Sequence, residues 1–198
     1  MADQSTTPPS ARQTALMEQQ IQELINLSED ELYRTLGMQM HQAELAQENN
    51  PAALEEAQAK GAFAEPEEAE MGLGENLRTF GARWWGDFEP KLYNLLCDAE
   101  NPQRDQILAK LSQSSDAAAI NAAVTTEGSS SADKIAMVIA PLLVSLLPFN
   151  LPIIASAGAA IAAKMIVASG LKTTCEMWQE SIEERAKAKA ELDEATQG

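Results

Sequence analysis

The stretch that decides the fold is residues 135–163, IAMVIAPLLVSLLPFNLPIIASAGAAIAA, which carries no charged side chain. Proline lacks the backbone N–H that a continuing helix needs, so the sequence NLP at 150–152 predicts a break within this run. The pattern therefore predicts a helical hairpin with arms at 135–149 and 153–169. A helix that is apolar nearly all round has to be covered by protein or by lipid, and the sequence leaves both alternatives open.

We expect the large apolar side chains of both arms to be covered, either in a membrane or in a protein core. These hairpin residues are Ile135, Val138, Ile139, Leu142, Leu143, Leu146, Leu147, Phe149, Ile153, Ile154, Ile161 and Ile166. The turn between the arms is predicted at Pro148, Asn150 and Pro152. The arms would be about 22 Å and about 25 Å long, shorter than a hydrocarbon core of roughly 30 Å. We therefore expect a shielded or conditionally inserting hairpin rather than a permanent transmembrane one.

The chain is strongly acidic, with 14 basic and 30 acidic residues and a net charge of -16. Such a charge is repelled by nucleic-acid phosphates, so we expect no nucleic-acid partner. The exception is the segment 134–172, which carries Lys134, Lys164 and Lys172 and no acidic residue. These flanking cations either pair with carboxylates of the acidic body or face anionic lipid headgroups, and the sequence is compatible with both interpretations.

The two cysteines, Cys97 and Cys175, lie far apart and have no spacing typical of a metal site. We therefore expect free, buried thiols and a reducing compartment. The first residues, MADQSTTPPSARQ, have neither the basic nor the apolar region of a secretory signal. Together these observations predict a cytoplasmic protein, with a peripheral or integral position at the inner face of a membrane as an option.

Composition divides the chain into four parts. Residues 1–10 are polar and contain proline, which predicts a disordered tail. Residues 11–60 predict an N-terminal helical hairpin, and the acidic, glycine-containing stretch 61–74 predicts a linker. Residues 75–198 predict a helical bundle that contains the hydrophobic hairpin at 135–169.

Helix boundaries in the N-terminal part are marked by short motifs. Ser28, followed three residues later by Glu31, matches a capping box and predicts a helix that begins at about residue 29. Pro51 can open a further short helix, because its missing N–H is not needed in the first turn. Gly61 is expected to end that helix.

An aromatic face is expected on the helix that follows the linker. Phe80, Trp84 and Phe88 recur at helical spacing and predict its core-facing side, and Pro90 is expected to begin a new segment. Trp85 points away from that side, which makes it a candidate contact residue. The candidate contact residues for a protein partner are Trp85, Leu32 and Leu36.

Helical periodicity also marks the stretches at 105–111, 116–124 and 171–192, and no segment shows the alternation of a strand. The predicted fold is therefore all-α, a helical bundle around the hydrophobic hairpin. The single histidine, His41, has no serine, cysteine or metal-ligand partner at motif spacing. We accordingly expect no enzymatic activity, no cofactor and no metal site.

The layout of a two-armed apolar hairpin wrapped by amphipathic helices resembles that of the pore-forming colicin domain. The resemblance is architectural, covers the hairpin and its wrapping, and carries over no residue motif. It implies a hairpin that enters a bilayer when the bundle opens, as a membrane anchor or a pore-forming effector. The alternative is a soluble all-α interaction or adaptor module that buries the hairpin and binds a protein partner through its N-terminal helices. Membrane lipid, a protein partner and an oligomer are all compatible with this sequence.

Overall fold

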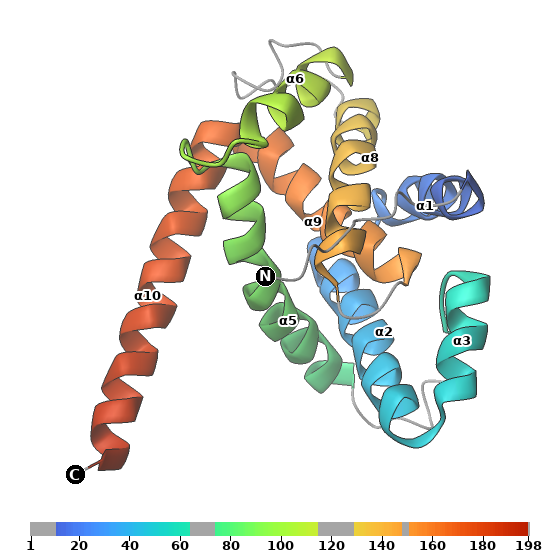
Figure 1. The fold of residues 1–198 in the computed structure, drawn as a ribbon, viewed down its shortest axis with the longest axis horizontal. Coiled ribbons are helices and arrows are strands. Elements are labelled where there is room, and N and C mark those ends of the chain that lie inside the picture. The colour runs from blue at the N-terminus through green and yellow to red at the C-terminus, as the bar shows by residue number, and fades with distance from the viewer. Residues whose placement is uncertain (1–10, 64–73, 115–128, 148–150, 198) are drawn as a thin grey trace.

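The computed structural model describes residues 11–63, 74–114, 129–147 and 151–197 (Figure 1). Across these four ranges the chain forms eight helices and no strand, which confirms the predicted all-α fold. The helices are α1 (Ala11–Leu24), α2 (Glu29–Asn49), α3 (Pro51–Lys60), α5 (Gly74–Leu96), α6 (Arg104–Ser114), α8 (Ser129–Leu146), α9 (Pro152–Ser169) and α10 (Leu171–Gln197).

Several sequence-based predictions fall outside the described residues. They are the tail at 1–10, most of the linker at 61–74, the short helix at 116–124, and Pro148, Phe149 and Asn150 of the hairpin. The fold is therefore described from the helices on either side of these segments.

The predicted boundary motifs of the N-terminal helices are confirmed. The Ser28 hydroxyl accepts a hydrogen bond from the Glu31 amide at 3.3 Å, and the Glu31 carboxylate accepts one from the Ser28 amide at 2.7 Å. This reciprocal capping box satisfies two amides at the start of α2 that have no partner within the helix. Pro51 opens α3, and Gly61 ends it with a left-handed φ of 88°.

Pro90 does not begin a new segment, as the sequence pattern predicted, but lies within one continuous helix, α5. A proline inside a helix removes one backbone hydrogen bond and pushes against the preceding turn. Here both sides of Pro90 are fixed by packing, since Phe88 and Leu92 are almost completely buried. Burial of two such side chains contributes about 1.5–3 kcal/mol each, which is enough to offset the missing hydrogen bond.

The hydrophobic hairpin consists of α8 and α9, which pack closely against each other. Pro152 occupies the first turn of α9, where its missing N–H costs nothing. Gly170 ends α9 and leads directly into α10. In Figure 1, α9 runs through the middle of the molecule with other helices on several sides.

Four helices cover the hairpin. α1 packs against both α8 and α9, and α6 packs against α8. α2 and α10 pack against α9 and also against α5. The N-terminal helices and the hairpin therefore share one hydrophobic core. The predicted division of the chain at residues 61–74 stays a prediction.

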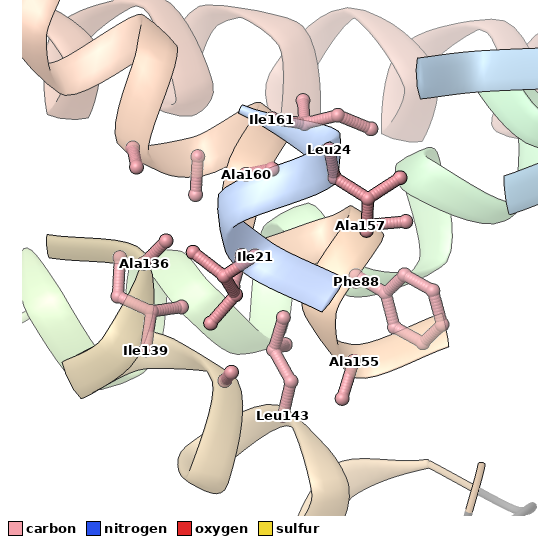
Figure 2. Close-up of a cluster of buried hydrophobic side chains, with 14 of the residues drawn as sticks. Ile21, Leu24, Phe88, Ala136, Ile139, Leu143, Ala155, Ala157, Ala160 and Ile161 are labelled. Carbon is pink, nitrogen blue, oxygen red and sulfur yellow. The ribbon is translucent and has the colours of Figure 1, made fainter. Parts of the chain in front are cut away.

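Figure 2 shows where four of these helices meet. The side chains of Ile21 and Leu24 from α1 lie between the two arms of the hairpin, with Phe88 from α5 nearby. The hairpin contributes Ala136, Ile139 and Leu143 from α8 and Ala155, Ala157, Ala160 and Ile161 from α9. Small side chains on α9 thus face large ones on its neighbours, which lets the helices approach closely.

α2 and α5 cross at two glycines. A Cβ atom on Gly37 would lie 2.0 Å from the carbonyl oxygen of Leu77, and one on Gly81 would lie 1.9 Å from that of Tyr33. Real Cβ atoms essentially never approach another heavy atom to less than 3.0 Å. The crossing is therefore possible only because neither residue carries a side chain.

The prediction of free cysteine thiols is wrong. Cys97 and Cys175 form a disulfide, with Cα atoms 5.6 Å apart, and both side chains are partly exposed. The two cysteines are 78 residues apart in sequence, and they meet because α10 runs back along α5. The argument from free thiols to a reducing compartment therefore no longer holds, because disulfides persist mainly in oxidising surroundings.

Candidate functional site

α9 is the most deeply covered part of the hairpin. Twelve of its 18 residues are buried, including every residue from Ile154 to Ala163. The helix has a mean hydropathy of 1.6 and is long and apolar enough to cross a membrane. Core helices of soluble proteins can have the same length and composition, so these two properties alone do not distinguish lipid from protein as its cover.

Small side chains bring the two arms of the hairpin close together. A Cβ atom on Gly158 of α9 would lie 3.0 Å from the Cδ1 atom of Leu143 on α8. Helix contacts built on glycine, alanine and serine occur both in membranes and in water. The hairpin could therefore keep its internal packing in either surrounding.

The three flanking lysines differ in their environments. Lys164 is half-buried, and its ammonium group donates a hydrogen bond to the carbonyl oxygen of Leu27, just beyond the end of α1. Lys172 lies 3.8 Å from the Glu176 carboxylate, with both side chains largely exposed. Lys134 is exposed. The acidic body therefore supplies a nearby carboxylate to Lys172, whereas Lys164 is held by a backbone carbonyl.

One face of α8 is only partly covered, and we call it the α8 outer face. It consists of Lys134, Met137, Val138, Pro141, Leu142 and Ser145, all of them exposed or half-buried. The opposite side of the helix is buried in the core. At the far end of α8, the exposed Lys91 of α5 donates a hydrogen bond to the Leu146 carbonyl oxygen at 3.4 Å. The α8 outer face is thus apolar along its length, with a lysine at each end.

A hollow of about 320 Å³ adjoins the α8 outer face, between α1 and α8. Its lining residues are Ile21, Gln22, Asp133, Lys134, Met137 and Val138. Partial burial raises the pKa of Asp133, and one of its carboxylate oxygens has no hydrogen-bond partner. The hollow therefore combines an apolar wall with one acidic and one basic group.

The predicted hairpin residues lie in two environments. Ile135, Ile139, Leu143, Pro152, Ile154, Ile161 and Ile166 are buried, whereas Val138, Leu142, Leu146, Leu147 and Ile153 are half-buried. The buried group faces the neighbouring helices, and the half-buried group comes mainly from α8. Most of the predicted hairpin residues with apolar surface within reach of an outside partner therefore belong to α8.

The three candidate contact residues are not available to a partner, which corrects that prediction. Leu32 and Leu36 are completely buried, and Trp85 is 5% exposed. Trp85 packs edge-to-face against Trp178 of α10, with ring centroids 6.2 Å apart. The helical periodicity of α5 predicted one buried face, the face that carries Phe88. α10 packs against another face of α5 and buries Trp85 there.

Sequence reasoning missed a polar cluster between α5 and α10. The Glu89 side chain is only 5% exposed and accepts hydrogen bonds from Arg185 and, at 3.1 Å, from Ser181. Nearby, the Tyr93 hydroxyl lies 3.3 Å from a side-chain oxygen of Gln179, to which it donates a hydrogen bond. The residues that meet are more than 80 positions apart, so no local motif could have revealed them. We call this cluster the α5–α10 clasp.

His41 is half-buried and lies edge-on to Phe80, with ring centroids 5.7 Å apart. Within the part of the chain that the structure describes, no group of three or more histidine, cysteine, aspartate or glutamate side chains could hold a metal ion. The expectation that the protein is not an enzyme stays a prediction.

We compared the chain with models of known protein families, with characterised proteins and with solved structures. No family model, no characterised protein and no solved structure matches it.

Proposed function

We propose that this protein associates with membranes through the α8–α9 hairpin, as an anchor or a pore-forming effector, and that the hairpin enters the bilayer only when its covering helices open. The observation that carries the proposal is an apolar hairpin that is wrapped by amphipathic helices and still presents a partly open, lysine-bounded outer face. The rest of the chain is acidic and would be repelled by an anionic membrane.

The free energies of transfer from water to the bilayer indicate that insertion of the hairpin depends on conditions outside it. The large apolar residues of the second arm contribute about -2 kcal/mol to insertion, whereas a lysine near a helix centre costs about 2.5–3.5 kcal/mol. Lys164 lies within this arm, so insertion of α9 alone is close to balanced. The surroundings of the hairpin, rather than its own hydrophobicity, would then decide whether it enters lipid.

The α8 outer face is the surface best suited to a first contact. Its half-buried apolar side chains can enter the boundary between headgroups and acyl chains, as in helices that lie on a membrane surface. A lysine close to an anionic surface contributes about 1 kcal/mol of attraction. Lys134 and Lys91, at the two ends of the face, would supply this attraction.

A charge-reversal pair tests this proposal. Lys134→Glu reverses one charge on the α8 outer face, whereas Lys187→Glu makes the same change on the exposed part of α10. Binding to phosphatidylglycerol–phosphatidylcholine vesicles is measured by flotation at low and at physiological salt. Lys134→Glu should weaken binding about tenfold or more, because about 2 kcal/mol of attraction is lost or reversed. Lys187→Glu should leave binding nearly unchanged.

Extraction with alkaline carbonate separates insertion from surface binding. Vesicle-bound protein that resists extraction has inserted its hairpin, whereas protein that is released has bound only at the surface. A wild-type protein that stays entirely in the supernatant with anionic vesicles, under both oxidising and reducing conditions, contradicts the proposed function.

A second candidate is a soluble interaction module, and one observation favours it. α10 extends beyond the body of the molecule, and every residue from Glu183 to Asp193 is exposed (Figure 1). Leu192 on this segment is 68% exposed, and Leu45 on α2 is 48% exposed. A partner protein could bind the extended helix or the surface near Leu45. A soluble complex that forms without vesicles, and is lost on Leu192→Glu, would support this alternative.

A further inference from the structure

The disulfide joins the end of α5 to the beginning of α10, the helix that follows α9. Cys97 directly follows the last residue of α5, and Cys175 lies in the second turn of α10. Only Gly170 separates α10 from α9. The first turns of α10 therefore lie next to the C-terminal end of the buried apolar helix.

Apart from the disulfide, α10 is held on the body by its packing against α5 and α9 and by the buried Thr174, which bonds to Ser169 and Gly170. Trp178 is completely buried and packs on Trp85. The α5–α10 clasp, centred on Glu89 and Arg185, adds polar contacts one to two turns further along. The residues from Glu183 to Asp193 are exposed, and the C-terminal part of α10 extends away from the molecule (Figure 1).

The disulfide lies at the margin of the hydrophobic core rather than inside it. Both Cys97 and Cys175 are only partly buried, unlike the fully covered core of the hairpin. Attack by a thiolate requires access to one of the two sulfur atoms, so accessibility is a condition for exchange. A disulfide fully enclosed in the core would resist reduction until the protein unfolded.

We propose that the Cys97–Cys175 disulfide is a redox latch that holds α10 against α5 and keeps the hairpin covered. This inference rests on the proposed function, because it names what regulates release of the hairpin. In oxidising surroundings the latch is closed. On entry into a compartment rich in reduced thiols, such as the cytoplasm, it opens, and α10 separates from α5 and from the end of α9.

The chemistry is ordinary thiol–disulfide exchange. A thiolate of a dithiol reductant attacks one sulfur of the disulfide, forms a mixed disulfide and displaces the other cysteine as a thiolate. The second thiol of the reductant then attacks the mixed disulfide and releases the second cysteine. Overall, two electrons and two protons pass to the protein, giving the Cys97 and Cys175 thiols and a disulfide of the reductant.

Reduction should loosen α10 more than the rest of the molecule. α2 is anchored independently of the disulfide, through its glycine crossing with α5 and its contacts with α9. A general loss of stability would lower the protection of all helices by the same factor. Opening of the latch would instead lower protection most in the first turns of α10, at residues 171–182.

The test measures amide hydrogen exchange of the full chain without lipid, before and after treatment with dithiothreitol. We expect exchange in 171–182 to accelerate at least tenfold more than exchange in α2, while the far-ultraviolet circular dichroism remains helical. The double variant Cys97→Ser/Cys175→Ser should match the reduced wild type and should not respond to dithiothreitol. Equal acceleration of both segments, or none, overturns the latch.

Vesicle flotation of the oxidised and reduced wild type completes the test and separates the two proposals. Greater binding of the reduced form, together with faster exchange in α10, supports both the latch and the proposed function. Faster exchange in α10 without vesicle binding by either form supports the latch and overturns the proposed function. Equal vesicle binding by both redox forms overturns the latch as a regulator and leaves membrane association in place.

Discussion

The glycine crossing of α2 and α5 gives a sharp prediction, because α5 contains a matched control. Gly81 and Gly86 both lie inside α5, so replacing either with alanine should gain about 1 kcal/mol from helix propensity. Their surroundings differ. An added Cβ would lie 1.9 Å from the Tyr33 backbone oxygen at Gly81, but 3.3 Å from the side-chain guanidinium of Arg185 at Gly86.

The cost of Gly81→Ala follows from this distance. Ordinary contacts begin at 3.4 Å, so the two backbones would have to separate by about 1.5 Å at the crossing. A gap of about 0.5–1 Å already forfeits a quarter to a half of the attraction between packed atoms. Overpacking costs about 3 kcal/mol where backbone meets backbone, the upper end of its usual range. After the gain in helix propensity, we expect Gly81→Ala to lower the free energy of unfolding by about 2 kcal/mol.

Gly86→Ala should leave stability unchanged or raise it by up to about 1 kcal/mol, since Arg185 has to move by only a few tenths of an ångström and can keep its hydrogen bond to Glu89. The two variants should thus differ by about 2–3 kcal/mol, or roughly 4–12 °C in Tm for a chain of this size. Urea unfolding followed by circular dichroism measures the first quantity, and thermal unfolding measures the second. Equal stability of the two variants would refute the close crossing of α2 and α5.

Three further predictions concern the helix cap and the disulfide. Ser28→Ala removes the capping hydrogen bond of α2 and should lower the free energy of unfolding by about 1 kcal/mol, measured by urea titration. Hydrogen bonds from the Ser28 hydroxyl and amide lower the pKa of Glu31 in the folded state, so its charge stabilises the protein above the unfolded pKa of about 4.3. The difference in stability between wild type and Glu31→Gln should therefore be full at pH 7 and disappear as the pH falls through the folded-state pKa. A difference that grows on acidification contradicts this assignment. Cys97→Ser/Cys175→Ser opens a loop of 78 residues and should cost about 4 kcal/mol by loop-closure entropy; a midpoint in urea equal to that of the oxidised protein contradicts the disulfide.

The features that the sequence predicted correctly depend on residues close together in the chain. The Ser28 capping box spans four residues, and Gly61 ends α3 through its own backbone conformation. The hairpin is visible because a long uncharged run has only one plausible form once a proline-containing break divides it. The cap signals operate over one or two helical turns, and the hairpin signal is one continuous run of sequence. Both kinds of signal can be read without knowing which helices meet in the fold.

The structural features that the sequence did not predict depend on where α10 lies. Trp85 was expected at the surface because the periodicity of α5 defines only the face that carries Phe88. α10 approaches from another direction, buries Trp85 and brings Cys175 to Cys97. Glu89 likewise finds Arg185 only through this approach. Local patterns report which faces a helix can bury, but not how many of its faces the tertiary structure will cover.

The composition of α9 explains why the covering helices, rather than α9 itself, would decide whether α9 lies in the protein core or in a bilayer. Alanine, glycine and serine make up much of its sequence, and each gains far less free energy on burial than leucine or isoleucine. The body therefore holds α9 less strongly than it would hold a leucine-rich core helix, and a bilayer also attracts it only weakly. When two environments compete at near balance, a change of a few kcal/mol in the covering helices shifts the population by orders of magnitude. The disulfide joins α5 to α10, which is one of those covering helices.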